Sequence, residues 1–241
     1  MKNYEIMKKY AFIILLLLLM LISCQTASAE DVNSTANEIF VNNGSSIQNA
    51  IDNASSGDTI IVNSGSYQEN IIINKTLNLK ANGTVTLNIS NINKPGFYIN
   101  NLGNNTRIEG FRIIGATSSS GIYLNGVSNC TIYNNNISGN LFGIYLENSY
   151  NNQILDNTIS SNIGYGIYST SSVNCLISGN TVSNNRAAGI NLNSDNTTIN
   201  QNNITQNGKQ TPSYWHGGGI WHNGNNTTIN QNNITQNSGT G

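Results

Sequence analysis

The residues of this chain that could carry out acid–base chemistry are few and scattered. From residue 95 onward the only carboxylates are Glu109, Glu147, Asp156 and Asp195. Hydrolysis of a glycosidic bond requires two carboxyl groups that face each other across that bond. Any such activity therefore depends on whether the fold brings two of these four residues together.

Aromatic and imidazole side chains gather in one segment near the end of the sequence. Tyr214, Trp215, His216, Trp221 and His222 include both Trp and both His residues of the chain. Indole and phenol rings present flat apolar faces with a polar edge, which suits stacking against a sugar ring. We predict carbohydrate contact here, although the same rings could instead cover an exposed end of the fold. Two His residues with no Cys, Asp or Glu nearby make a weak metal site, so we predict neither a metal nor another cofactor.

The segment 1–29 is typical of an export signal. A positive start with Lys2, Lys8 and Lys9 precedes the apolar run 11–22, which is too short to span a bilayer comfortably. Small residues at 27–29 indicate cleavage before Glu30. Alternatively, the sequence LISC ending at Cys24 resembles a bacterial lipobox, in which Cys24 carries a lipid. Both interpretations predict a secreted or cell-surface protein whose only membrane contact is this segment or its anchor.

Asn is by far the most frequent residue of the chain, while only 9% of residues are charged and the formal net charge is -1. Such a chain lacks the basic footprint of a nucleic-acid binder, so we predict no nucleic-acid partner. Many N-x-[ST] sequons follow from this composition, and they make N-glycosylation an open expectation. They include Asn74, Asn82, Asn88, Asn104, Asn136, Asn196, Asn203, Asn225 and Asn233.

A repeat with a period of about 22 to 23 residues organises the second half of the chain. Its units open with GIYLNG, GIYLEN, GIYSTS, GINLNS and GIWHNG, at Gly121, Gly143, Gly166, Gly189 and Gly219, and a weaker copy opens with GFYIN at Gly96. The stretch 196–207 is identical to 226–237. The starts of the last two units are further apart than the others, which indicates an insertion at 208–218.

Each unit contains three short alternations of apolar and polar residues, a pattern typical of strands with one buried face. In the unit at Gly121 these are Ile122-x-Leu124, Cys130-x-Ile132 and Ile137. Asn, Gly and Ser between them favour tight turns. Because so short a unit leaves no room for a crossover helix, we predict an all-β fold, a single-stranded right-handed parallel β-helix. A leucine-rich repeat has a similar period but requires Leu at L-x-x-L-x-L spacing.

The region before the repeats is predicted to close the open end of this solenoid. One helical stripe comprises Ile47, Ala50, Ile51 and Ala54. Ser45 or Ser46 is the expected N-cap, and Gly57-Asp58 is expected to end the helix. The predicted organisation is a signal peptide at 1–29, a linker at 30–45 and a β-helix at 46–241. Within the β-helix, 46–95 form the cap and first coils, and 96–241 form the repeat coils.

The register of the repeat predicts how side chains stack. No two of the four carboxylates share a position in their units, so no acidic cluster is expected. Cys130 and Cys175 are equivalent but lie two coils apart, about 9.6 Å by the strand spacing, which predicts free thiols. Asn residues at coil corners are expected to form hydrogen-bonded ladders that satisfy buried backbone groups. The proposed members are Asn140, Asn162 and Asn184 at one corner, and Asn134 and Asp156 at another.

Units of the form G-I-Y-L…N-x-x-I-x-x-N-x-I resemble the parallel β-helix repeats of the pectin-lyase-like superfamily, and in particular the Asn-rich, adhesin-like surface proteins of methanogenic archaea and bacteria. The resemblance covers the chain from about residue 40. It implies a fold and not an activity, because this fold has many functions.

These observations favour an exported cell-surface structural or adhesin-like protein that contacts surface glycans or polysaccharide. One alternative is a polysaccharide-acting lyase, hydrolase or epimerase, which the scattered carboxylates disfavour. The second is a periplasmic β-helix protein resembling the maturation factor of the copper site in nitrous oxide reductase, a possibility that the two His residues keep open.

Overall fold

The structure of the chain, a computed structural model, describes residues 36–209 and 216–239. The predicted signal peptide and the lipidation candidate Cys24 lie outside these residues, as do Tyr214 and Trp215. The described part is an all-β solenoid with one helix, α2 (Ile47–Asn53). Among the described residues, no helix has the length and apolar character needed to cross a bilayer.

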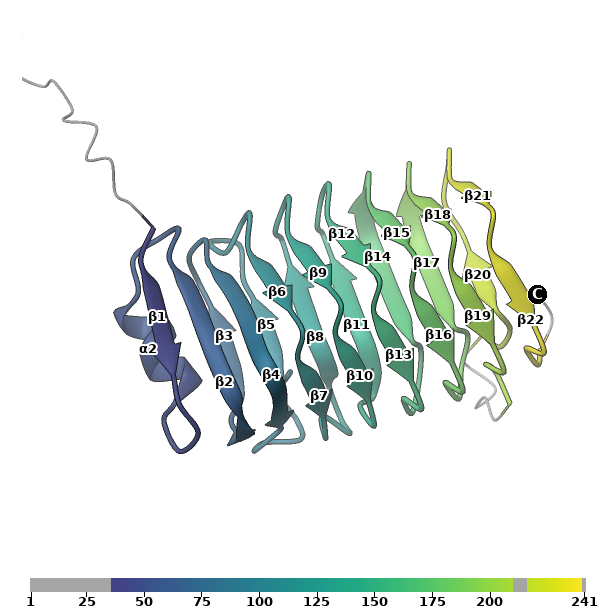
Figure 1. Cartoon of the computed structure of the whole chain (residues 1–241). Helices are drawn as coiled ribbons and strands as arrows, with labels where there is room; N and C mark the ends of the chain where they lie inside the picture. Colours follow the sequence, from purple (N-terminus) through teal and green to yellow (C-terminus); the bar gives the residue numbers. More distant parts are fainter. Residues whose placement is uncertain (1–35, 210–215, 240–241) are drawn as a thin grey trace, which may run out of the picture. The chain divides into compact units, whose positions relative to one another are not determined.

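From β6 onward, three short strands form each coil, and the strands of successive coils pair in parallel (Figure 1). One column of strands contains β3 (Ile71–Ile73), β5 (Phe97–Ile99), β8 (Ser120–Asn125), β11 (Phe142–Glu147), β14 (Ile167–Val173), β17 (Ile190–Asp195) and β20 (Ile220–His222). These seven strands correspond to seven coils. The predicted fold class, a parallel β-helix, is confirmed.

The other two columns form the remaining sides of each coil. One contains β1 (Glu38–Val41), β2 (Thr59–Gln68), β4 (Asn78–Asn88), β6 (Arg107–Glu109), β9 (Thr131–Tyr133), β12 (Gln153–Leu155), β15 (Leu176–Ser178), β18 (Thr198–Asn200) and β21 (Thr228–Asn230). The other contains β7 (Arg112–Ile114), β10 (Asn136–Ser138), β13 (Thr158–Ser160), β16 (Thr181–Ser183), β19 (Asn203–Thr205) and β22 (Asn233–Thr235). The long strands β2 and β4 take part in both columns and join them into one sheet.

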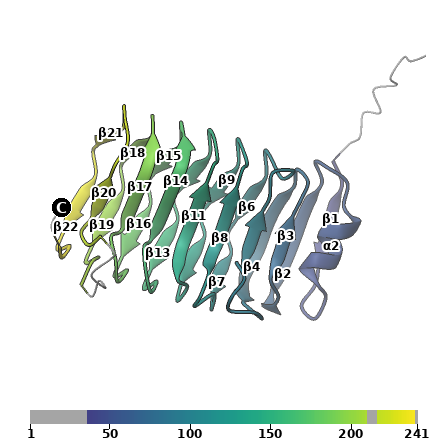
Figure 2. The same ribbon diagram turned by 180° about the vertical axis from the view of Figure 1, so that it is seen from behind.

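Helix α2 covers the first coil, at the end of the solenoid opposite β22 (Figure 2). Ser46 is its N-cap, with an Oγ that accepts a hydrogen bond from the Asn49 amide at 3.2 Å. Glu69 adds acceptors at the same end for the amides of Ile47 and Gln48, at 2.8 and 3.0 Å. Ile47 and Ile51 are buried, as the helical stripe predicts. The solenoid starts before residue 46, because β1 already pairs with β2.

Asn side chains form two hydrogen-bonded columns inside the coil corners. The first comprises Asn140, Asn162, Asn185, Asn207 and Asn237, and the second comprises Asn135, Asn157, Asn180, Asn202 and Asn232. In each step, the Oδ1 of one Asn accepts from the amide and the Nδ2 of the Asn in the preceding coil, at 2.9 to 3.3 Å. The buried corner amides are thereby paired.

The prediction that Asn side chains form hydrogen-bonded ladders is confirmed, but three of the five residues predicted as members do not belong to a ladder. Asn134, Asp156 and Asn184 have positive φ values of 53°, 54° and 56° and are exposed. The backbone turns at these positions, so the following residue carries the inward side chain. For Asn184 the error arose because the unit that begins at Gly143 has one residue more than the unit before it.

Cys130 and Cys175 are free and buried, and Asn152 occupies the equivalent position between them. Arg107 and Glu109 form an ion pair of 2.9 Å on the outer face of β6.

Candidate functional site

A column of aromatic side chains lies on the outer face of the strands from β5 to β20. Their register aligns Tyr98, Tyr123, Tyr145, Tyr168, Asn191 and Trp221. These residues follow an inward-facing Ile or Phe in each strand, so the alternation of a strand directs them outward. We call this set the aromatic column.

The first four rings of the aromatic column form a continuous stack. Ring centroids lie 5.3 Å apart for Tyr98 and Tyr123, 4.8 Å for Tyr123 and Tyr145, and 4.9 Å for Tyr145 and Tyr168. The last two steps are nearly parallel, with interplanar angles of 9° and 12°. These separations match the spacing between strands, so the backbone register alone brings the rings into contact.

One coil interrupts this stack. Its outward residue is Asn191, which is 2% exposed, and the next ring of the column is Trp221, one coil further on. A second, shorter row shows the same change: Phe142 and Tyr165 stack at 5.7 Å, whereas Ala188 precedes the unit glycine in the following coil. Two aromatic rings are therefore replaced by small or polar side chains in a single coil.

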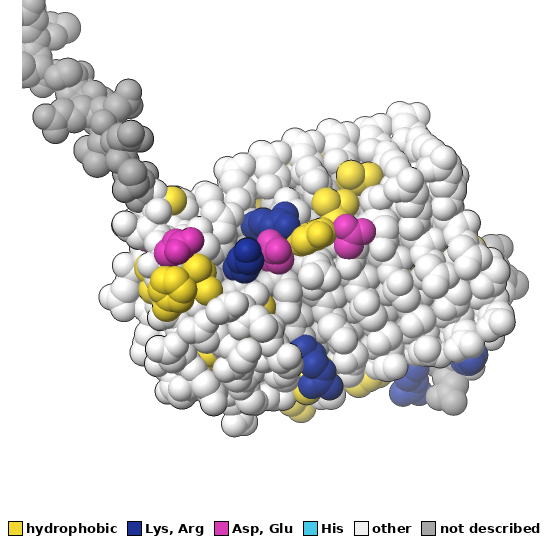
Figure 3. All heavy atoms as spheres, in the orientation of Figure 1, with side chains coloured by type: hydrophobic (Ala, Val, Ile, Leu, Met, Phe, Trp, Pro, Cys, Tyr) yellow, Lys and Arg dark blue, Asp and Glu magenta, His cyan; other side chains and the backbone are white. Residues whose placement is uncertain are grey.

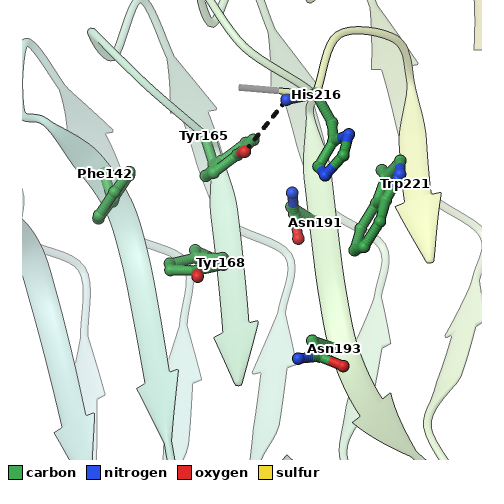
Figure 4. A pocket seen from close by; sticks show the side chains of 7 residues that line it. All are labelled: Phe142, Tyr165, Tyr168, Asn191, Asn193, His216 and Trp221. Atoms are coloured by element: carbon green, nitrogen blue, oxygen red, sulfur yellow. Dashed lines mark hydrogen bonds between the residues drawn. The ribbon is translucent and has the colours of Figure 1, made fainter. Parts of the chain in front are cut away.

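The interruption forms a groove of about 350 Å³ on the outer surface. Its lining residues are Phe142, Tyr165, Tyr168, Asn191, Asn193, His216 and Trp221. Figure 4 shows Asn191 between the tyrosines of the preceding coil and the His216–Trp221 pair. We call this feature the groove.

The insertion between the last two units supplies one wall of the groove. The His216 imidazole stacks on the Trp221 indole with centroids 3.9 Å apart and an interplanar angle of 9°. The His216 amide donates to the Tyr165 hydroxyl at 3.2 Å, and its carbonyl accepts from the Ala188 amide at 2.9 Å (Figure 4). The end of the insertion is thus fixed over the interrupted coil.

The remaining residue of the predicted aromatic segment lies elsewhere. His222 pairs in register with Leu192, whose side chain is fully buried, and so belongs to the inner face of β20. Its Nε2 atom is buried without a hydrogen-bond partner among the described residues. Trp221 and His222 are consecutive in one strand and therefore point to opposite faces.

The described residues that line the groove supply amide, phenol, indole and imidazole groups, and none of them is Asp, Glu, Lys or Arg. Burial raises the pKa of the Tyr165 and Tyr168 phenols, and the charge of Glu147 raises that of Tyr168 further. Both phenols are therefore protonated at neutral pH and can donate hydrogen bonds. The Asn191 side chain acts in the opposite direction on the Tyr165 phenol and lowers its pKa, but by less than burial raises it.

Glu147 lies beside the aromatic column and not in the groove. The hydroxyls of Tyr123 and Tyr145 both donate to its carboxylate, the latter at 3.1 Å. Thr170 and Asn193 follow it in register along the next two coils. In the same register the neighbouring coils carry Asn125, Thr170 and Asn193, so Glu147 has no second carboxylate beside it in this row. The paired carboxyl groups of glycoside hydrolysis are not formed along this row.

Of the residues named from the sequence, His216 and Trp221 line the groove, whereas its other lining residues Phe142, Tyr165, Tyr168, Asn191 and Asn193 were not named. The signal is present in the repeat: the units open with F-G-I-Y at Phe142, Y-G-I-Y at Tyr165, A-G-I-N at Ala188 and G-G-I-W at Gly218. Reading the outward positions down the aligned units would have located both the rings and the interruption.

A family model described as "Periplasmic copper-binding protein (NosD)" matches residues 51–241. The described residues do not fit a copper site in their donor chemistry. No group of three or more His, Cys, Asp or Glu residues gathers among them. His216 and His222 belong to opposite faces, and burial raises the pKa of the Cys130 thiol to about 11, which disfavours the thiolate that binds metal.

One relative is a "Cell surface glycoprotein" of Methanothermus fervidus, 35% identical over 133 residues. The match covers 54% of this chain, and the chain spans about a fifth (21%) of that relative.

Solved structures with the same fold include an alginate lyase of Paenibacillus, with a TM-score of 0.73 and 20% identity over 81% of this chain and 75% of that one. The pectate lyase Pel9A gives a TM-score of 0.67 and 17% identity over 83% and 63%. These likenesses show the right-handed parallel β-helix fold alone. Because the family model spans most of the chain, the protein belongs to the NosD family.

Proposed function

We propose that this protein is an exported, cell-surface β-helix protein that binds carbohydrate through the aromatic column and its groove. The single observation that carries the proposal is the groove itself, a surface cavity walled by aromatic rings on both sides and floored by amides. Aromatic faces suit the apolar faces of sugar rings, and amide and hydroxyl groups suit their hydroxyls.

Location at the cell surface is supported by the relative named as a cell surface glycoprotein and by the periplasmic description of the family. The leader predicted at 1–29, with cleavage before Glu30 or lipidation at Cys24, agrees with this location. The remaining domain organisation is proposed as predicted, with the solenoid extended to include β1.

An enzyme acting on polysaccharide is the main competing function. The groove lacks a carboxylate among its described lining residues, and Glu147 is held by two tyrosines outside it. Binding without cleavage therefore fits the described side chains better. Handling of copper, the other alternative, is disfavoured by the donor chemistry of the described residues.

The proposal is tested by retention on immobilised polysaccharides and on a glycan array. We expect Trp221→Ala to weaken retention at least about tenfold, corresponding to ~1.4 kcal/mol, because it removes one wall of the groove. The matched control is Tyr150→Ala, which removes a 47% exposed ring that does not line the groove. Equal retention of the wild type and Trp221→Ala would contradict carbohydrate binding at this site.

A further inference from the structure

The hydroxyls of the aromatic column are bonded to a row of polar side chains that runs beside it. Asn125, Glu147 and Thr170 hold the same position in β8, β11 and β14, so they lie one coil apart on the outer face. We call these three residues the polar row. Asn193 continues their register one coil further and also lines the groove, so the polar row leads towards the groove.

Tyrosine hydroxyls determine which atoms of Glu147 and Thr170 remain available to a ligand. The Tyr123 and Tyr145 hydroxyls both donate to the Glu147 carboxylate, the latter at 3.1 Å. A carboxylate has about four acceptor positions, and the two phenols occupy two of them. Because a phenol has one proton, the Thr170 hydroxyl is the donor in its 3.2 Å contact with the Tyr145 oxygen. The Thr170 proton is therefore used, while its oxygen can still accept.

Asn125 has the same orientation with respect to its neighbouring ring. Its Nδ2 atom donates to the Tyr98 oxygen at 3.0 Å, and no described residue donates to its Oδ1 atom. The polar row thus presents oxygen acceptors in three neighbouring coils, about 4.8 Å apart at the usual strand spacing. A ligand group that fits these oxygens must donate hydrogen bonds.

The negative charge of Glu147 has no ionic partner among the described residues. Opposite charges are paired elsewhere on the solenoid. Arg107 and Glu109 bond at 2.9 Å on the outer face of β6, and Figure 3 shows basic and acidic side chains next to each other in that part of the surface. Glu147 therefore differs from Glu109 in that its charge is left for a ligand to balance.

The other described charges that flank this strand column do not neutralise Glu147. His216 lies over the coil of β17, two coils from β11, with its ring stacked on an indole. Lys75, after β3, is three coils away and donates to backbone carbonyls at the end of α2, at 3.2 and 2.8 Å. Asp195, the last residue of β17, adds a carboxylate at the same end of the strands as Glu147. The remaining basic residues come before the starts of their strands: Lys94, Arg186 and Lys209.

From these contacts we propose that the polar row binds the protonated amine of an amino sugar. The proposal rests on the carbohydrate-binding function proposed above and names the class of sugar. An ammonium group has three donors and no acceptor, so it can bond to the Glu147 carboxylate and to the Asn125 and Thr170 oxygens in the flanking coils. Its bond to the carboxylate is charge-assisted and stronger than that of a neutral hydroxyl. A sugar carboxylate brings no donor and is repelled by Glu147.

Oligosaccharides with free and with blocked amines test this proposal. The protein is titrated calorimetrically at pH 6 with oligomers of glucosamine and with oligomers of N-acetylglucosamine of the same linkage and length. The two series differ in whether the nitrogen is charged. We expect the free-amine series to bind at least about tenfold more tightly, corresponding to ~1.4 kcal/mol. Equal affinities, or no binding of the free-amine series, overturn the proposal.

Glu147→Gln isolates the charge, because the amide oxygen can still accept from the Tyr123 and Tyr145 hydroxyls. Affinity for the free-amine series should fall at least about tenfold, and affinity for the acetylated series by less than about twofold. The matched control Glu109→Gln removes the same charge from β6, in another column, and should leave the ratio of the two affinities unchanged. Equal losses in the two variants would mean that net charge attracts the amines, and would overturn the proposal.

Thr170→Val provides a second variant should Glu147→Gln fail to fold. It removes one acceptor oxygen with little change of shape, and it should lower the preference for the free amine about threefold, or ~0.7 kcal/mol. An undiminished preference in this variant overturns the assignment of the amine to the polar row.

The outcomes keep the two proposals apart. If the acetylated oligomers bind as tightly as the free amines and Trp221→Ala weakens retention on polysaccharide, carbohydrate binding survives and amine recognition fails. If neither series binds and Trp221→Ala is retained as well as the wild type, both proposals fail.

Discussion

The two inward Asn columns and the outward aromatic column have the same period, yet only the aromatic column is interrupted. The two Asn columns run through five successive coils each without a change of residue type. The aromatic column changes from Tyr168 to Asn191 and then to Trp221. The difference follows from what each side chain is paired with.

An Asn in an inward column satisfies backbone groups that have no access to water. Asn162, for example, accepts from the Asn140 amide at 3.0 Å and donates to the Ile137 carbonyl at 3.3 Å. Replacement of the Asn by a side chain that cannot make these bonds leaves both backbone groups buried without a hydrogen-bond partner. A tyrosine of the outer column packs on neighbouring rings, and the Tyr123 and Tyr145 hydroxyls bond to Glu147, which is partly exposed. A missing ring therefore leaves a cavity without leaving a buried polar atom unpaired. Variation, and hence binding specificity, can develop on the outside with little loss of stability.

The largest effect is therefore expected from breaking an inward column. Asn162→Leu should lower the free energy of unfolding by at least about 2 kcal/mol, because it leaves two or more buried backbone groups unpaired at ~1 to 3 kcal/mol each. Chemical denaturation measures this change. Asn136→Leu, an exposed position on β10, is the control and should shift the unfolding free energy by less than about 0.5 kcal/mol. Similar effects from the two variants would refute the distinction between the columns.

Alkaline pH should lower the free energy of unfolding by a smaller amount, because the buried thiols of the interior resist ionisation in the folded protein. Burial raises the pKa of Cys130 from 9.0 to about 11, and it also raises that of Cys175. A folded-state pKa above the unfolded value means that the folded chain holds the proton more tightly. The associated stability is complete below pH 9 and is lost as the pH rises towards 11. For Cys130 alone, the loss by pH 10 is about 1 kcal/mol.

Unfolding free energies at pH 8, 9 and 10 check this expectation. The double variant Cys130→Ala and Cys175→Ala should show a flatter dependence over this range, whatever its absolute stability. The phenols of Tyr145 and Tyr168, whose pKa values are raised from 10.0, extend the loss to higher pH in both proteins. Parallel pH profiles for the two proteins would show that the thiols contribute nothing.

The same comparison explains which parts of the structure the sequence could predict. The period, the strands, the cap with Ser46 and the free thiols follow from local pattern and strand spacing, and the structure has all of them. Tyr168 and Asn191 could also have been predicted, because they occupy the outward position when the units are aligned. The contact of His216 with Trp221 could not be predicted, because the insertion departs from the repeat and its end is positioned by contacts with Tyr165 and Ala188.

The smallest change in the chain that tests the comparison involves two adjacent residues, Asn184 and Asn185. Asn184 is exposed with φ of 56°, a conformation that glycine adopts without strain, whereas Asn185 belongs to an inward column. Asn184→Gly should therefore change the unfolding free energy by less than about 0.5 kcal/mol, while Asn185→Gly should lower it by at least ~2 kcal/mol. Both variants introduce the same residue, so a glycine effect on the unfolded chain is largely shared. Only the direction of the side chain differs, and equal losses would mean that the ladder register is misplaced by one residue.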